Sequence, residues 1–207
     1  NKWFKLFLLI IILRKQFFNI LKYIADKVLE YKQKYNLGFA LYGTPSESLC
    51  DRFARVDKQE FGDIKGITDK GYYDNSFHVS SRINMSPFEK LRLEALGHKY
   101  SAGGHISYIE TDSLTKNLDA IPDILRYAKS VGIHYMGINQ PVDKCHICGY
   151  KGEFTATKEG FTCPQCGNHD SNEMSVIRRV CGYLAQPNAR PFNKGKQEEI
   201  MHRVKHN

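Results

Sequence analysis

Four cysteines in the second half of the chain have the spacing of a metal site. They form two Cys-x-x-Cys pairs, Cys145 with Cys148 and Cys163 with Cys166, and fourteen residues separate the pairs. A glycine follows each pair directly, and a residue without Cβ allows the tight turn that points backbone amides at metal-bound sulfurs. Four soft thiolates predict a tetrahedral structural zinc site.

Disulfide bonds and a different metal are the alternatives to zinc at these cysteines. Two disulfides are disfavoured because the sequence shows no complete secretory signal, and paired cysteines outside secreted proteins more often bind metal. An iron site of rubredoxin type would have the same spacing. His146 and His169 could also act as ligands, but four cysteines suffice, so we expect both histidines to face solvent.

A second candidate site is Gly43-Thr44-Pro45-Ser46-Glu47-Ser48. Thr44 suits a helix N-cap, Pro45 the first helical position, and Glu47 the third, which together predict a capping box. A helix N-terminus after a strand also suits an anion, although the capping box explains the residues without a ligand. In the helix that follows, Leu49, Phe53 and Val56 are expected to be buried, and Cys50 to be a core or half-buried thiol.

The elements that must position these residues follow from the apolar periodicity. Besides the helix after Pro45, we predict helices at 17–36, 117–130 and 195–206, a helix or linker at 86–100, strands at 39–42, 64–68, 75–81, 103–109 and 133–138, and a small hairpin at 150–162. This order fits part of an α/β architecture. His78 alternates with Phe77 and Val79, so it could point into a site or outward, and a lone histidine more often points outward. The apolar run from Phe4 to Leu13 is too short to cross a bilayer, so we expect a buried segment of a truncated domain or a non-native start.

The charge of the chain is uneven. The formal net charge is +8, and residues 178–207 contain seven Lys and Arg against two Glu, or about +5. Within this tail, Glu199 is expected to pair with Arg203 four residues later on the last helix. A basic tail beside four cysteines could indicate a zinc-ribbon module that binds nucleic acid. A solvated basic face explains the charge equally well.

The segment Arg178-Arg179-Val180-Cys181-Gly182-Tyr183-Leu184, with Arg190-Pro191-Phe192-Asn193 and Gly195-Lys196, resembles the C-terminal glycyl-radical segment of anaerobic (class III) ribonucleoside-triphosphate reductases. The resemblance covers about residues 17–207 and includes the four cysteines and the segments at 43–48, 75–78, 103–106 and 135–139. Other glycyl-radical enzymes, such as pyruvate formate-lyase, share the glycine motif. The adjoining four-cysteine site favours the reductase.

This resemblance implies a fold and a division of the chain. Residues 1–140 would form the C-terminal part of a ten-stranded α/β barrel, residues 141–176 a four-cysteine zinc module, and residues 177–207 the radical segment. Gly182 would carry the radical, because an unpaired electron at Cα spreads onto the flanking amides only when the centre is planar, and a side chain would clash there. Cys181 is not assigned to the metal.

The resemblance also implies partners and a reaction. A separate activating enzyme, with an iron–sulfur cluster and S-adenosylmethionine, would take a hydrogen atom from Gly182. A cysteine thiyl radical would then take the 3′-hydrogen of a ribonucleoside triphosphate. The 2′-hydroxyl would leave as water and formate or a thiol would supply the electrons, in a cytoplasmic homodimer without membrane contact. Six residues are candidates for substrate binding: Thr44, Ser46, Glu47, Ser48, Asn75 and His78. The thiyl cysteine has no counterpart in this sequence, so the chain alone is expected to be inactive.

Overall fold

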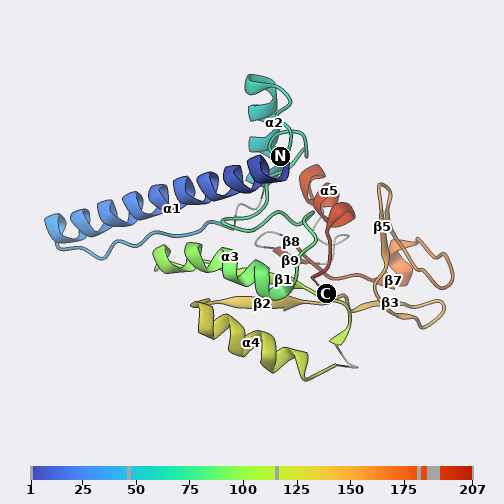
Figure 1. The fold of residues 1–207 in the computed structure, drawn as a ribbon. Helices are drawn as coiled ribbons and strands as arrows, with labels where there is room; N and C mark the ends of the chain where they lie inside the picture. The colour runs from blue at the N-terminus through green and yellow to red at the C-terminus, as the bar shows by residue number, and fades with distance from the viewer. Residues whose placement is uncertain (1, 46–47, 115–116, 181–182, 186–191, 207) are drawn as a thin grey trace.

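The computed structural model describes residues 2–45, 48–114, 117–180, 183–185 and 192–206. The first helix, α1 (Lys2–Tyr35), confirms the helix predicted after Phe17 but begins at Lys2. It extends from the rest of the molecule, so Leu21 is buried whereas most of its predicted apolar stripe is exposed (Figure 1). Edge-to-face contacts attach it to the body, with ring centroids 5.4 Å apart for Phe18 and Tyr100.

The second helix, α2 (Leu49–Phe61), begins later than predicted and buries another face. Its N-cap is Ser48, which makes no side-chain cap bond, so the helix start predicted at Thr44 and Pro45 is wrong; Glu47, the other half of the predicted capping box, lies outside the described residues. The backbone before it is instead tied to a distant loop, because the Gly43 amide donates to the Gly104 carbonyl at 2.8 Å. The predicted buried stripe is exposed, while Cys50 is buried as predicted.

The three predicted strands at 39–42, 64–68 and 75–81 do not form. Strands need neighbours for their backbone groups, and these segments satisfy those groups in other ways. Thr68 closes a turn through its hydroxyl, which accepts from the Ile64 amide and donates to the Gly62 carbonyl. The Asp74 carboxylate accepts from the Ser81 amide at 2.9 Å.

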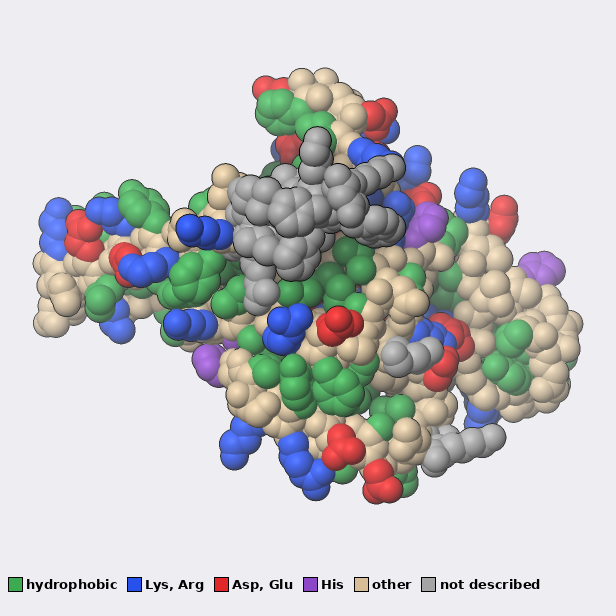
Figure 2. All heavy atoms as spheres, viewed as in Figure 1, with side chains coloured by type: hydrophobic (Ala, Val, Ile, Leu, Met, Phe, Trp, Pro, Cys, Tyr) green, Lys and Arg blue, Asp and Glu red, His purple; other side chains and the backbone are tan. Residues whose placement is uncertain are grey.

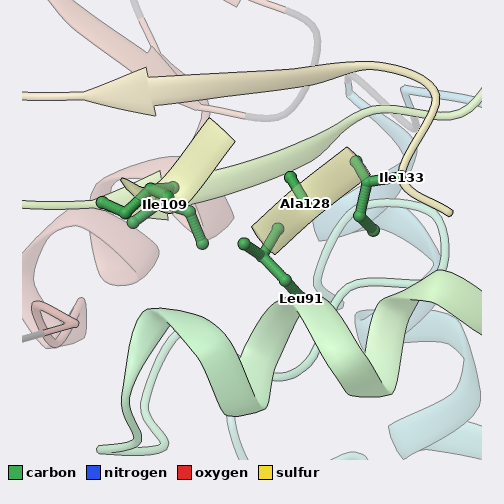
Figure 3. Packing of buried hydrophobic residues seen from close by; sticks show 5 residues of the cluster. Leu91, Ile109, Ala128 and Ile133 are labelled. Carbon is green, nitrogen blue, oxygen red and sulfur yellow. The ribbon is translucent and has the colours of Figure 1, made fainter. Parts of the chain in front are cut away.

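The centre of the molecule is a β–α–β unit with a supporting helix. Strands β1 (Ser107–Glu110) and β2 (Met136–Asn139) pair in parallel, with Ser107 opposite Met136, and α4 (Ala120–Val131) connects them. Helix α3 (Pro87–Tyr100) begins with a full capping box between Ser86 and Glu89. Figure 3 shows the core they form: Leu91, Ile109, Ile124, Ala128 and Ile133.

The four-cysteine region forms a separate small module at one end of the molecule, on the right in Figure 1. Its strands are β3 (Asp143–Cys145), β4 (Lys151–Gly152), β5 (Thr155–Thr157), β6 (Gly160–Thr162) and β7 (Met174–Ser175), with the 3-10 helix η2 at Ser171–Glu173. Strand β3 lies between β4 and β7, and β5 pairs with β6 in the predicted hairpin.

The chain then returns to the main body. Strands β8 (Arg178–Val180) and β9 (Tyr183–Ala185) are antiparallel, and α5 (Lys194–His202) packs against α2. A second core joins Cys50, Val180 and Phe192. The architecture is mixed α/β, and the described ranges contain no closed barrel.

Exposed apolar side chains gather on the two N-terminal helices. Figure 2 shows them along α1 and at the tip of α2, among charged groups of both signs. Within the described part of the chain, no helix combines the length and apolar character that crossing a membrane would demand.

Candidate metal centre and the residues around it

The four cysteines converge as their spacing predicts. The sulfurs of Cys145, Cys148, Cys163 and Cys166 all lie within 4.8 Å of one another. The Sγ atoms are 3.7 Å apart between Cys145 and Cys166, and also between Cys148 and Cys163. Four sulfurs about 2.3 Å from a central zinc would be about 3.8 Å apart, whereas a disulfide needs about 2.05 Å. The geometry therefore fits one tetrahedral metal ion and excludes disulfides within the cluster.

Two matching turns position the sulfurs. The Gly149 amide donates to the Cys145 carbonyl at 3.1 Å, and the Gly167 amide donates to the Cys163 carbonyl at 2.9 Å. Both glycines have positive φ, 74° and 73°, a conformation that other residues rarely adopt. The glycine after each cysteine pair is therefore a requirement of the turn.

The surrounding protein shifts the pKa values of Cys145 and Cys148 in opposite directions. The backbone amide of Cys148 stabilises the Cys145 thiolate, and with the Asn168 side chain it lowers the pKa of Cys145 to about 6. Although the Tyr150 amide favours the Cys148 thiolate, burial and the neighbouring cysteines raise the pKa of Cys148 to about 12. Four thiolates this close repel one another, so a bound cation is needed to keep all four deprotonated.

The two histidines near the cluster are not among the ligand atoms. His146 and His169 are exposed, as predicted, and the ring of His146 lies 3.0 Å from the Ser175 hydroxyl. Behind the sulfurs the module has its own small core of Phe154, Met174 and Val176.

The structure does not bring the candidate substrate residues into one pocket. Thr44 lines an open pocket of about 300 Å³ beside Cys50 and Ser76. Asn75 and His78 border a separate cavity of about 30 Å³, which has room for about one or two water molecules. Of the remaining candidates, Ser48 caps α2 and is exposed, and Ser46 and Glu47 lie outside the described residues.

His78 does not point outward, which corrects the prediction from alternation. One of its ring nitrogens, Nε2, lies 2.5 Å from the Ile106 carbonyl oxygen, and the ring packs edge-on against Tyr108. Burial lowers the pKa of His78. The outward prediction assumed a strand, and the segment is a turn packed against β1.

A buried polar cluster lies beside His78 and was not predicted. The rings of His98 and His105 are 4.2 Å apart, and burial lowers their pKa values to about 4 and about 3. His105 Nε2 and both polar atoms of the Asn75 side chain have no hydrogen-bond partner among the described residues. His98 lies near the end of α3 and His105 just before β1, so only the tertiary packing brings them together.

The glycine expected to carry the radical, Gly182, lies outside the described residues, as does Cys181. The flanking strands are described, and Val180 of β8 pairs with Tyr183 of β9. Val180 is fully buried.

Comparisons with known proteins agree on one family. A sequence profile described as "Anaerobic ribonucleoside-triphosphate reductase" matches residues 13–206. The protein of that name from Escherichia coli K12 is 48% identical over 194 residues, which cover 94% of this chain and 27% of the relative. The enterobacteria phage T4 protein of that name is 48% identical over 177 residues, 86% of this chain and 29% of the relative. The chain thus spans just over a quarter of the length of these relatives.

Solved structures show the same fold at lower identity. A structure titled "Anaerobic ribonucleotide reductase" superposes with a TM-score of 0.69 at 22% identity, covering 91% of this chain and 28% of the other. The Thermotoga maritima anaerobic ribonucleotide reductase in complex with dATP and CTP superposes with a TM-score of 0.60 at 22% identity, covering 87% and 27%.

Proposed function

The chain belongs to the anaerobic ribonucleoside-triphosphate reductase family, and from that premise we propose that it forms the radical-storing and metal-binding part of such an enzyme. The full-length enzyme would reduce ribonucleoside triphosphates to deoxyribonucleoside triphosphates without oxygen, for DNA synthesis. The observation that carries the proposal is the four-sulfur cluster, which precedes β8 in the chain, within a sequence that matches the family from residue 13 to residue 206.

In this proposal the three parts of the chain keep separate roles. Residues 1–140 contribute to a ten-stranded barrel, residues 141–176 bind zinc at Cys145, Cys148, Cys163 and Cys166, and residues 177–207 carry the radical at Gly182. When bound, zinc supplies a positive charge that holds four thiolates in one place. The barrel interpretation is supported by the parallel β1–β2 pair with its crossover helix, a unit typical of barrels.

The radical would be stored on the backbone of Gly182 and used to generate a thiyl radical elsewhere in the full-length enzyme. The chain's own task is then to hold the glycine in place and keep solvent away, which the buried side chain of Val180 supports. Hydrogen-atom removal from Gly182 would need a separate activating enzyme that uses S-adenosylmethionine and an iron–sulfur cluster. Formate or a thiol would supply the electrons, and the full-length enzyme would work as a cytoplasmic homodimer.

The substrate residues remain part of the proposal. Thr44, Ser46, Glu47 and Ser48 would contact the triphosphate near the start of α2, where first-turn amides without intrahelical partners favour anions. Asn75 and His78 would act deeper in the barrel. The unpaired polar atoms of Asn75 support a role for it beyond packing.

The alternative of a nucleic-acid-binding zinc ribbon is disfavoured by the pairing of the basic tail. Arg178 pairs with Asp143, Arg203 with Glu110 and Glu199, and Lys205 with Asp112 and Glu153. Cations already bound to protein carboxylates are poorly placed to contact phosphates. Salt-dependent DNA binding by this chain would support the zinc-ribbon alternative.

The test is radical formation in the full-length protein. After anoxic activation we expect a doublet in the electron paramagnetic resonance spectrum, which Gly182→Ala abolishes. Gly38→Ala is a matched control, because a Cβ at Gly38 meets no atom within 4 Å. Air should then cleave the activated chain at Gly182. An intact chain after this treatment, or a doublet that survives Gly182→Ala, would overturn the proposal.

A further inference from the structure

Three consecutive residues of β8 are held by three different parts of the molecule. Arg178 pairs with Asp143 of the four-cysteine module. The next residue, Arg179, donates from Nε to the Tyr108 hydroxyl of β1 at 2.8 Å, and Val180 enters the core with Cys50 of α2. Each of these three residues therefore attaches the strand that leads to Gly182 to a different part of the molecule.

The attachment of Arg178 is the most extensive of the three. Both of its terminal nitrogens donate to the Asp143 carboxylate, with Nη2 2.5 Å from Oδ2, and Nη2 also donates to the Phe154 carbonyl at 3.4 Å. The guanidinium lies 5.0 Å from the centre of the Phe161 ring. Arg178 is 8% exposed and Asp143 is 1% exposed, so both charges are withdrawn from water and depend on each other.

Asp143 is connected directly to the cysteine cluster. It lies two residues before Cys145 on β3, and its carboxylate also accepts from the Phe154 amide at 2.8 Å. Phe154 packs in the same small core as Cys145 and Cys163. The groups that hold Arg178 are thus the residues that surround the sulfurs.

The order of this module depends on its metal. Its strands are only two or three residues long, and such short strands are not stable alone. In small domains of this kind, metal binding supplies much of the folding free energy. The position of Asp143, and with it that of Arg178, therefore depends on the bound ion.

We propose that Arg178 is a positioning residue that passes the metal-dependent geometry of the module to β8, so that radical formation at Gly182 requires the Asp143–Arg178 pair. The proposal rests on the proposed function, because it assumes that Gly182 carries the radical. It assigns the four-cysteine module a mechanical role: the module is the anchor of the strand before the radical residue.

The experiment separates metal binding from radical formation in the full-length enzyme. Zinc per chain, the urea unfolding midpoint and the rate of doublet growth with the activating enzyme are measured for wild type, Arg178→Gln, Arg178→Lys and Cys163→Ser. We expect Arg178→Gln to keep its zinc and form the radical about 10- to 100-fold more slowly, since a misplacement of about 1 Å can cost on the order of 100-fold in rate. Arg178→Lys keeps the charge but loses the two-pronged geometry, so its rate should lie in between. Cys163→Ser should lose both zinc and radical.

Arg126→Gln is the matched control. Arg126 also pairs with an aspartate, Asp123 on α4, but its side chain is 75% exposed, so none of the three measurements should change. A zinc-loaded Arg178→Gln protein that forms the radical at the wild-type rate would overturn the proposal. If that variant does not fold, Arg178→Lys decides: slowed radical formation with full zinc supports the proposal, and an unchanged rate overturns it. Absence of a doublet in zinc-loaded wild type would instead refute the proposed function.

Discussion

The buried histidines should make the fold sensitive to mild acid. Burial is the main cause that lowers the pKa of His98 to about 4, of His105 to about 3 and of His206 to about 4. His206 Nδ1 accepts a hydrogen bond from the Glu110 amide at 2.9 Å, which a protonated ring nitrogen cannot do. The folded protein therefore resists protonation of all three rings.

The sign and size of the effect follow from these pKa values. In the unfolded chain the histidines titrate near 6.5, so above that pH both states are neutral and the pKa difference contributes nothing. As pH falls below 6.5, the unfolded state binds protons that the folded state does not, and stability is lost until pH reaches about 4. Each ring contributes at most about 1.4 kcal/mol per pH unit, or roughly 2 kcal/mol by pH 5. Together the three would remove about 6 kcal/mol by pH 5, which is comparable with the low end of the roughly 5–15 kcal/mol stability of a typical domain.

Charged neighbours also act on the pKa values of these histidines, with smaller effects than burial. Glu94 favours the protonated rings of His98 and His105, while Lys90 and the other histidines disfavour a charge on His105. Burial raises the pKa of Glu94, but Lys90 and His78 outweigh it and lower the pKa below its usual value. The stabilisation of the fold by ionised Glu94 is therefore lost at lower pH than that of the neutral histidines.

The assay is urea unfolding at pH 7.5, 6.5 and 5.5, with circular dichroism as the readout. Against wild type, His105→Gln should lower the pH slope of the unfolding free energy by about one quarter, since it removes one of four rings, His78 included, whose pKa is lowered in the folded protein. His169→Gln, which changes an exposed ring, should leave the slope unchanged. An unchanged slope in His105→Gln would refute the reasoning.

Three further perturbations test other parts of the structure. Cys163→Ser should reduce bound zinc from about one per chain to almost none and expose the module to proteolysis; elemental analysis that still finds a full equivalent would contradict this. Lys90→Met should cost about 3–5 kcal/mol, because it leaves the Glu94 charge buried without its partner, and adding Glu94→Gln should recover part of that loss in urea unfolding. A double variant no more stable than the single one would count against this role of the pair. Gly195→Ala should cost about 1–3 kcal/mol, because the new Cβ would lie 2.9 Å from Asp51 Cβ and 3.0 Å from Asp51 Cα; calorimetry showing an unchanged melting temperature would mean that α2 and α5 can separate without cost.

The features that the sequence predicts well are local ones. The cysteine pairs converge because each pair and its glycine form one turn, and spacing along the chain fixes that geometry. The hairpin at β5 and β6 and the helix α4 are local in the same sense. The predicted salt bridge of Glu199 with Arg203, four residues apart, is confirmed.

The features that the sequence misses depend on distant partners. The period of Leu49, Phe53 and Val56 correctly indicates a helix, but α5 packs against the face that carries Cys50. The Asp143–Arg178 pair joins residues 35 positions apart, and no rule of sequence spacing predicts such a pair. The buried histidines come from separate elements, so their shared environment exists only after folding.

The β1–α4–β2 unit has a consequence for the order in which the chain folds. Its paired strands are joined by a single crossover, so loop closure costs comparatively little entropy and the unit can form early. The contacts of Val180 and Phe192 with Cys50 close a loop of well over a hundred residues and should form last. The strand before Gly182 would thus be locked only once the scaffold exists, and pulse-labelling hydrogen exchange should show its amides gaining protection after those of β1 and α4.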